Sequence, residues 1–203
     1  MASVIAFGET FLDLDCRSLN DITLNLGGAC ANLAADISLL GGKSAIITKI
    51  TNDYIGRHLL SSLKGYGINT DGVRIVENDD IINTLNIIYS SASNIGYLTY
   101  DIFSVSECIQ KKDVDLNLLN KYDIFHFGSK SVSSINSLLF CINESKKLGK
   151  KISYDVNYRD KIWKDNHSII NGIQKFVSIS DFIKMNSYEA SLFFKICKFR
   201  KIT

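Results

Sequence analysis

Residues 27–34 read Gly-Gly-Ala-Cys-Ala-Asn-Leu-Ala, a pair of glycines that leads directly into an apolar repeat. Apolar residues then recur at spacings of four, four and three positions, at Ala29, Leu33, Ile37 and Leu40. This spacing predicts an amphipathic helix, which a second glycine pair, Gly41-Gly42, brings to an end. Short apolar runs at 3–7 and 45–50 predict buried strands on either side of it. The quoted stretch therefore lies within a strand–helix–strand unit.

Strands and helices alternate along most of the remaining chain. Asp53 is predicted to cap a helix at 54–66. Further on, strands are predicted at 123–127, 152–156 and 182–185, and helices at 132–148, 169–177 and 187–197. Such alternation implies parallel strand pairing and an α/β core.

Two segments, 11–26 and 78–104, do not fit inside a parallel sheet. They alternate apolar and polar residues, as strands with one solvent-exposed face do. The second segment is predicted to contain strands at 84–90 and 96–103. We expect them to form a small separate sheet, a lid over one end of the main sheet. Residues 1–203 then make up a single domain that carries this lid.

Composition and charge limit the classes of function that this chain can have. The chain has 203 residues, of which 46% are hydrophobic and 22% charged, and its formal net charge is +2. This balance is that of a globular domain, and it predicts no general attraction to nucleic acid or to an anionic membrane. The sequence shows no apolar stretch long enough to cross a bilayer and no signal peptide at its start, which predicts a cytoplasmic protein. Five cysteines without paired spacing indicate neither a disulfide framework nor a zinc site.

The first candidate site surrounds the glycine pair. Ligands of open α/β sheets bind beyond the carboxyl ends of the strands, where Asp13, Gly27, Gly28 and Asn32 are expected. Paired glycines let backbone approach a ligand closely, and a carboxylate and an amide can hold neighbouring hydroxyls of a polyol. The alternative is a glycine turn in which the aspartate only caps the helix.

Two further candidates follow later strands. Asp155, Asn157 and Arg159 stand at alternate positions and would reach one side of an extended backbone, unless they form a solvated loop with a local ion pair. Asn186 and Glu189 are expected at a helix start, where they can approach a metal-bound phosphate or form only a capping box. Neither a dinucleotide-binding Gly-x-Gly-x-x-Gly pattern nor a Walker loop is present.

Taken in order, these motifs resemble the ribokinase/PfkB family of carbohydrate kinases, and most closely its fructokinase branch. The resemblance covers about residues 3–193 and is carried by five separated motifs: Gly8-Glu9 with Asp13 and 27–34, then 41–68 with Ile50-Thr51-Asn52-Asp53-Tyr54-Ile55-Gly56, then 125–129, then 155–159 with Trp163, and 181–186 with Glu189.

The resemblance implies a ribokinase-like, doubly wound fold with a β-sheet lid, which often forms the dimer contact in this family. It also implies transfer of the ATP γ-phosphate to a sugar hydroxyl, with Mg²⁺, and a fructose-like substrate. Asp13, Gly27, Gly28 and Asn32 would bind the sugar. Arg159, with Asp155 and Asn157 behind it, would line the region between sugar and phosphate. The Asn186/Glu189 pair would organise phosphate and Mg²⁺.

The sequence also departs from the family pattern. The glycine-rich anion hole and the catalytic aspartate that follows it have no counterpart, and the chain is about a third shorter than usual. No catalytic residue is therefore assigned, and we expect this chain alone to be inactive and to lack the adenine-binding elements. Thr51 stands where a glycine is usual, and Asp101 stands near the place of a lid arginine. The alternative is a non-catalytic sugar-binding or regulatory module. In either case an exposed sheet edge is expected.

Overall fold

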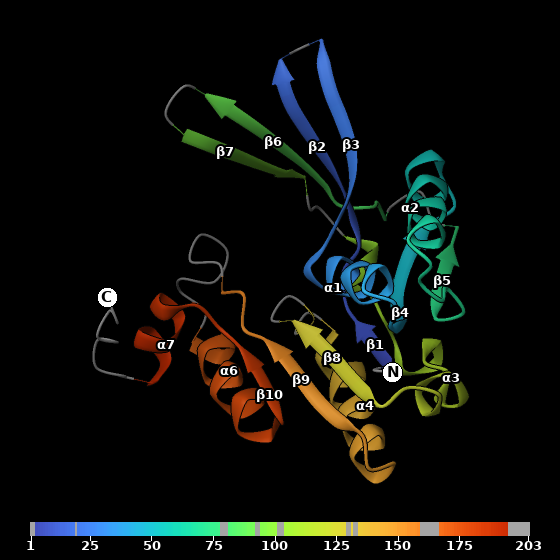
Figure 1. The fold of residues 1–203 in the computed structure, drawn as a ribbon, viewed down its shortest axis with the longest axis vertical. Coiled ribbons are helices and arrows are strands. Elements are labelled where there is room, and N and C mark those ends of the chain that lie inside the picture. Colours follow the sequence, from blue (N-terminus) through green and yellow to red (C-terminus); the bar gives the residue numbers. More distant parts are fainter. Residues whose placement is uncertain are drawn as a thin grey trace.

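A computed structural model describes residues 3–18, 20–77, 81–91, 94–100, 104–128, 131, 134–158 and 167–194. Its main sheet has the order β10-β9-β8-β1-β4-β5, and every neighbouring pair is parallel (Figure 1). The strands are β1 (Ser3–Phe7), β4 (Lys43–Thr51), β5 (Val73–Val76), β8 (Ile124–Gly128), β9 (Lys151–Asp155) and β10 (Phe182–Lys184). The helices are α1 (Ala29–Leu39), α2 (Tyr54–Gly65), α3 (Leu116–Asn120), α4 (Ile135–Lys147), α6 (His167–Ile179) and α7 (Ser187–Phe194).

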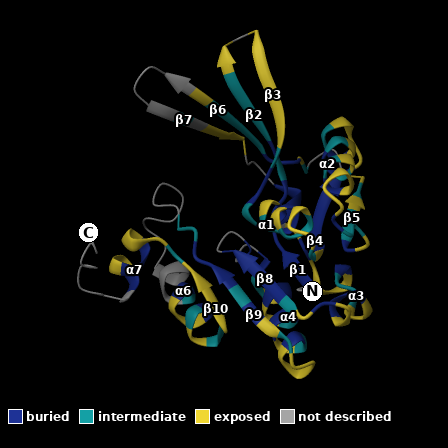
Figure 2. Cartoon of the chain, in the orientation of Figure 1, coloured by how far each residue is buried: buried dark blue, intermediate teal, exposed yellow. Residues whose placement is uncertain are grey.

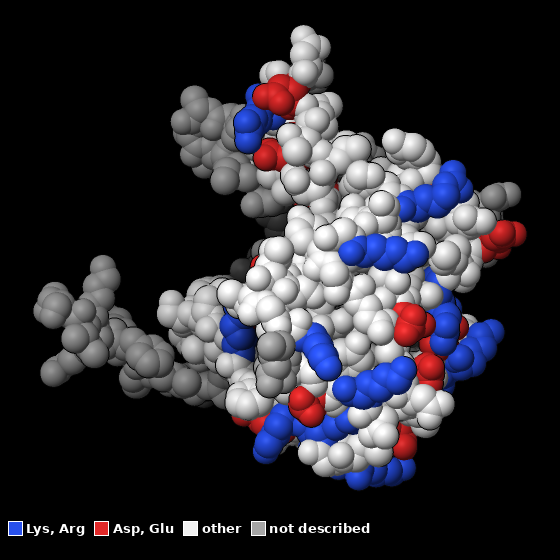
Figure 3. Space-filling view, turned by 45° about the vertical axis from the view of Figure 1, so that its right-hand side comes forward, with Lys and Arg blue, Asp and Glu red and all other residues white. Residues whose placement is uncertain are grey.

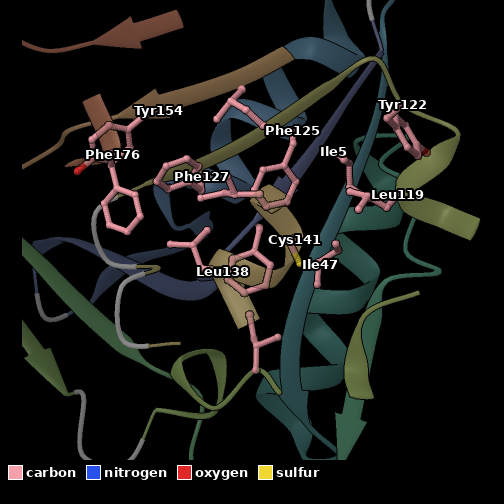
Figure 4. Packing of buried hydrophobic residues seen from close by; sticks show 14 of the residues in the cluster. Ile5, Ile47, Leu119, Tyr122, Phe125, Phe127, Leu138, Cys141, Tyr154 and Phe176 are labelled. Atoms are coloured by element: carbon pink, nitrogen blue, oxygen red, sulfur yellow. The ribbon is translucent and has the colours of Figure 1, made fainter. Parts of the chain in front are cut away.

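Helices cover both faces of this sheet, because successive strand residues point to opposite sides. On one face, Ala6 and Ile46 pack against the alanine-rich side of α1 and against Leu63 of α2. On the other face, Phe127 packs against Tyr154 with ring centroids 4.7 Å apart, and Phe176 of α6 contacts both rings. Leu138 and Cys141 of α4 and Leu119 of α3 continue this cluster toward Ile5 (Figure 4). Small residues on the α1 side let that helix approach the strands closely. The expected doubly wound α/β core is therefore confirmed.

A second sheet of four strands rises above the carboxyl ends of β1 and β4 (Figure 1). Its order is β3-β2-β6-β7, with β2 (Phe11–Ser18), β3 (Asp21–Gly27), β6 (Leu85–Ser91) and β7 (Asn94–Tyr100). In the space-filling view it projects from the body of the molecule (Figure 3). We call this small sheet the lid. Its presence beside the parallel sheet agrees with the predicted fold class.

The two faces of the lid differ in polarity. One face is apolar, and near the main sheet Leu12 and Leu26 of this face pack with Ile50 and Leu59. Farther out the lid strands become exposed (Figure 2). The opposite face carries one polar row across all four strands, formed by Asn25, Asp13, Asn86 and Thr99.

Some elements were not predicted from the sequence, and some predicted bounds differ. β5 and α3 are short, with four and five residues, and lie in stretches that carry no strong periodicity. Helix α7 is described only to Phe194, so the predicted extension to 197 lies outside the described residues. β10 is one edge of the described sheet and leaves Phe182 and Ile183 exposed, as expected for an open edge.

A buried ion pair ties the segment that follows the lid to β4. The Nζ atom of Lys49 lies 2.7 Å from Oδ2 of Asp113, and both side chains are almost entirely buried. Lys49 also donates to the carbonyl of Cys108, and the amide of Gln110 donates to the Asp113 carboxylate. The pair therefore fixes residues 108–113 as they return from the lid to the core.

Replacing Lys49 with Met should lower the free energy of unfolding by about 3 kcal/mol, because a buried carboxylate loses its cation. The matched control is Lys147→Met, which breaks the exposed pair with Glu144 and should cost less than about 0.5 kcal/mol. Urea denaturation followed by circular dichroism measures both changes. Equal losses in the two variants would contradict a stabilising role for the buried pair.

Candidate functional site

The glycine pair joins the lid to the first helix of the main sheet. Gly28 has φ +104°, and a Cβ atom there would lie 2.5 Å from the carbonyl oxygen of Glu9. A Cβ atom on Gly27 would lie 2.6 Å from Oδ2 of Asp13 and 2.6 Å from the ring of Phe11. Position 28 thus requires glycine for its positive φ and for the absence of a Cβ atom. Position 27 requires glycine only because a Cβ atom would collide with its neighbours. The pair brings Asp13 against the start of α1.

Asp13 lies on lid strand β2, in the middle of the polar row, and is half-buried. The Nδ2 atom of Asn86 donates to Oδ1 of Asp13 over 3.1 Å. Burial raises the pKa of the Asp13 carboxyl, and the hydrogen bond from Asn86 opposes that rise. Asn86 could not be predicted from the sequence, since its neighbour Asp13 lies 73 positions away and only the strand register brings the two together.

The helix cap comes from a different residue than the sequence suggested. The Oε1 atom of Glu9 accepts a hydrogen bond of 3.2 Å from the backbone amide of Ala29. The idea that Asp13 caps this helix is therefore wrong, because Asp13 is turned toward Gly27 and Asn86. Asn32 lies in the first turn of α1 with its side chain exposed. Asp13 thus lies beside Gly27, whereas Asn32 follows the glycine pair in the first turn of α1.

Asp155 ends β9 and forms an ion pair with the strand beside it. Its Oδ2 atom lies 2.7 Å from Nζ of Lys184 on β10, while Oδ1 is buried and has no partner among the described residues. This bond matches the alternative of a local ion pair, although the cation is Lys184. Beside it, Nδ1 of His126 pairs with Ser153 Oγ at 3.0 Å. Burial lowers the pKa of His126 to about 4, despite the nearby Asp155 carboxylate.

The backbone after Asp155 turns instead of staying extended. Asn157 has φ 36°, in the left-handed region that asparagine tolerates better than most residues. The backbone is therefore not extended at Asn157, and the condition under which Asp155 and Asn157 would reach one side is not met. The turn directs the amide of Tyr158 to Oε1 of Glu189, over 2.7 Å. Arg159 and Trp163 lie outside the described residues, as do Ser129 and Asp101.

Asn186 and Glu189 form a reciprocal capping box at the start of α7. The amide of Glu189 donates to Oδ1 of Asn186 over 2.8 Å, and the amide of Asn186 donates to Oε2 of Glu189 over 2.7 Å. The capping-box alternative is therefore confirmed, with Asn in place of Ser or Thr. Glu189 is buried and also holds Tyr158, so one carboxylate joins the loops after β9 and β10. That second bond was not predicted.

The segment after β4 is held by a hydrogen-bond network at the base of the lid. Asp53 caps α2 through the amide of Gly56, as predicted, and also accepts from the hydroxyl of Thr51 over 2.6 Å. Asn83, which leads into β6, bonds to both Thr51 and Asp53. A Cβ atom on Gly56 would collide with the Thr51 carbonyl, so only glycine fits there. Thr51 thus connects α2 to the entry of the lid.

Two other features are absent from the described residues. In the part of the chain that the structure describes, no three His, Cys, Asp or Glu side chains gather as metal ligands. Within the same described residues, no helix has the length and hydropathy required to span a membrane.

The arrangement of sheet, lid and glycine pair can be compared with known proteins. The model of the pfkB family carbohydrate kinases matches residues 1–201. The chain belongs to this family. It is 30% identical over 198 residues to probable fructokinase-5 of Arabidopsis thaliana, an alignment that covers 93% of the chain and 61% of the relative. It is 28% identical over 200 residues to an ATP-dependent 6-phosphofructokinase of Thermoanaerobacterium thermosaccharolyticum, covering 94% of the chain and 61% of that protein.

Solved structures of family members share the fold. Fructokinase from Xylella fastidiosa with bound ATP aligns with a TM-score of 0.85 at 21% identity, covering 94% of this chain and 60% of that one. Halothermothrix orenii fructokinase aligns with a TM-score of 0.83 at 24% identity, covering 97% of this chain and 72% of that one. The ribokinase-like fold is therefore confirmed. The chain spans about three fifths of the length of the curated relatives described above.

Replacing Gly28 with Ala should lower the free energy of unfolding by at least about 3 kcal/mol, because backbone strain and the collision with Glu9 add together. Gly41 is the matched control, since it also has a positive φ, of +81°, but has open space around it. Gly41→Ala should cost only about 1 kcal/mol. Urea denaturation of both variants decides the point, and equal costs would show that no close approach exists at Gly28.

Proposed function

We propose that this chain supplies the sugar-binding part of an ATP-dependent sugar kinase with a fructose-like substrate. The observation that supports it most directly is the carboxylate of Asp13, which lies against Gly27 at the junction of lid and α1. An ionised carboxylate is an acceptor only, and it can take hydrogen bonds from two sugar hydroxyls. Membership of the pfkB family and fructokinases among the relatives support the choice of sugar.

The proposed sugar contacts come from both sides of the glycine pair. Asp13 on the lid accepts from sugar hydroxyls, and Asn32 on α1 offers an exposed amide. Gly27 and Gly28 carry no side chain, which lets the Asp13 carboxylate and the Glu9 carbonyl come close to the backbone at this junction. The lid then covers the sugar and keeps water away from the reacting hydroxyl.

The proposed phosphate side lies at the ends of β9 and β10. Asp155 and Asn157 position the segment that leads to Arg159, which would line the region between sugar and phosphate. Asn186 and Glu189 would organise the phosphate through the backbone they hold, because both oxygens of Glu189 already accept from backbone amides. Glu189 thus already holds the backbone, and the described residues gather no Mg²⁺ ligand set. ATP would supply the phosphoryl group.

Catalysis needs a group that takes the proton of the attacking hydroxyl and donors that stabilise the transferred phosphoryl group. We assign neither to a residue of this chain. Loss of one stabilising donor alone can lower a rate by about 10²–10³. The 203-residue chain alone is therefore proposed to bind sugar without turning over ATP.

The apolar face of the lid supports a further proposal, a homodimer formed through the lid. Beyond the part that packs on α2, this face exposes five large side chains, Ile22, Leu24, Tyr89, Leu98 and Tyr100, each to between 42% and 54%. The strand register places them on one side in adjacent rows. A contiguous apolar surface of this kind is self-complementary across a two-fold axis and is stabilised by burial.

Asp13→Asn should weaken fructose binding at least tenfold in isothermal titration calorimetry, because a charged acceptor becomes a neutral amide. The matched control is Asp15→Asn, two residues farther on the same strand and face, which should bind fructose as the unaltered chain does. A coupled assay for ADP should detect no turnover. Fructose binding that survives in Asp13→Asn, or turnover by the unaltered chain, would contradict the proposal. Absence of fructose binding by the unaltered chain would also overturn it.

Leu98→Arg should convert the dimer to a monomer, since it places a charge in the apolar surface of the lid. Thr99→Arg is the control, because the next residue on β7 points to the opposite, polar face. Size-exclusion chromatography with light scattering gives the mass of each. A monomeric unaltered chain, or a dimer that persists in Leu98→Arg, would count against the lid contact.

A further inference from the structure

Asn86 occupies the position next to Asp13 in the polar row of the lid. The row runs from Asn25 on β3 through Asp13 on β2 and Asn86 on β6 to Thr99 on β7. Asn86 reaches Asp13 with its amide nitrogen, 3.1 Å from Oδ1. The nitrogen must face the carboxylate, because the amide oxygen would meet another acceptor. The orientation of the Asn86 amide is thus fixed by its partner.

The other end of the Asn86 amide is not satisfied. Its Oδ1 atom is buried and has no hydrogen-bond partner among the described residues. A buried acceptor without a partner lowers stability, so this asparagine is a poor choice for folding alone. The contact that Asn86 does make is the hydrogen bond that its amide nitrogen donates to Asp13.

The two carboxylate oxygens of Asp13 then have different surroundings. Oδ1 accepts a hydrogen bond from Asn86. Oδ2 lies beside Gly27, 2.6 Å from the position that a Cβ atom on that glycine would take. A carboxylate that is held by a hydrogen bond at one oxygen cannot rotate freely about the Cβ–Cγ bond of the aspartate. Oδ2 is therefore kept on the side of the glycine pair, toward the start of α1.

We propose that Asn86 is a positioning residue for Asp13, which holds one carboxylate oxygen so that the other faces a sugar hydroxyl beside Gly27. This rests on the proposed function, because the sugar is the ligand that Asp13 would receive. The amide also favours the ionised form of this half-buried carboxyl, since a hydrogen-bond donor stabilises the charged form. The Asp13 carboxylate can then only accept hydrogen bonds, which suits the hydroxyl donors of a sugar.

The test follows the titration of the Asp13 carboxyl carbon by NMR in the whole chain, without sugar. Asn86→Ala should move the Asp13 pKa upward, because burial is no longer opposed by a donor. Asn86→Asp should move it further, since a second carboxylate replaces the donor. Asn25→Ala is the matched control, because Asn25 is the same residue type, pairs with Asp13 in register on β3, and makes no side-chain hydrogen bond to the Asp13 carboxylate. Its titration should not change.

Fructose affinity supplies the second measurement. Asn86→Ala should weaken binding about tenfold at pH 7, and its binding should fall off at a higher pH on acidification than in the unaltered chain. An Asp13 titration that is unmoved in Asn86→Ala, or moved equally in Asn25→Ala, overturns the positioning role whatever fructose does. If the unaltered chain does not bind fructose, the proposed function fails, together with the role toward sugar. The sugar-free titration then still decides whether Asn86 holds Asp13.

Discussion

The close approach of the Glu9 carbonyl to Gly28 is the constraint on which the rest of the site depends. No side chain fits between them, and the same glycine adopts a positive φ that leads the chain from the lid into α1. Glu9 then caps that helix through Ala29, so the segment between the first strand and the lid is held against the helix start. This contact joins the base of the lid to the first helix of the main sheet, where we propose that the sugar binds.

Several polar residues at these strand ends make structural contacts that a sequence motif does not reveal. Glu189 joins two loops through backbone amides, and Asp155 pairs with Lys184 across neighbouring strands. Their positions follow from parallel pairing, since the carboxyl ends of β9 and β10 meet at the same edge. A structural role and a role toward phosphate do not exclude each other, because fixed backbone amides are also good phosphate donors. The side chain of the lid residue Asp13, by contrast, bonds with Asn86 alone among the residues that the structure describes.

Local patterns in the sequence were sufficient for the fold and for part of the site. The helix after Gly28 follows from the spacing of Ala29 and Leu33, and the Asp53 and Asn186 caps follow from residue type. Contacts between distant strands could not be obtained in this way. Asn86 meets Asp13 only through the register of β2 and β6, and Lys184 meets Asp155 through that of β9 and β10. The turn at Asn157 was missed because it depends on Glu189, which lies 32 positions farther along the chain.

A crystal structure of the chain with bound fructose tests the central claim most directly. The account predicts that a sugar hydroxyl lies within hydrogen-bond distance of Oδ2 of Asp13, and that the ring rests over the backbone of Gly27 and Gly28 with Asn32 on its other side. A sugar bound away from the glycine pair, or an Asp13 carboxylate turned away from Gly27, would contradict it.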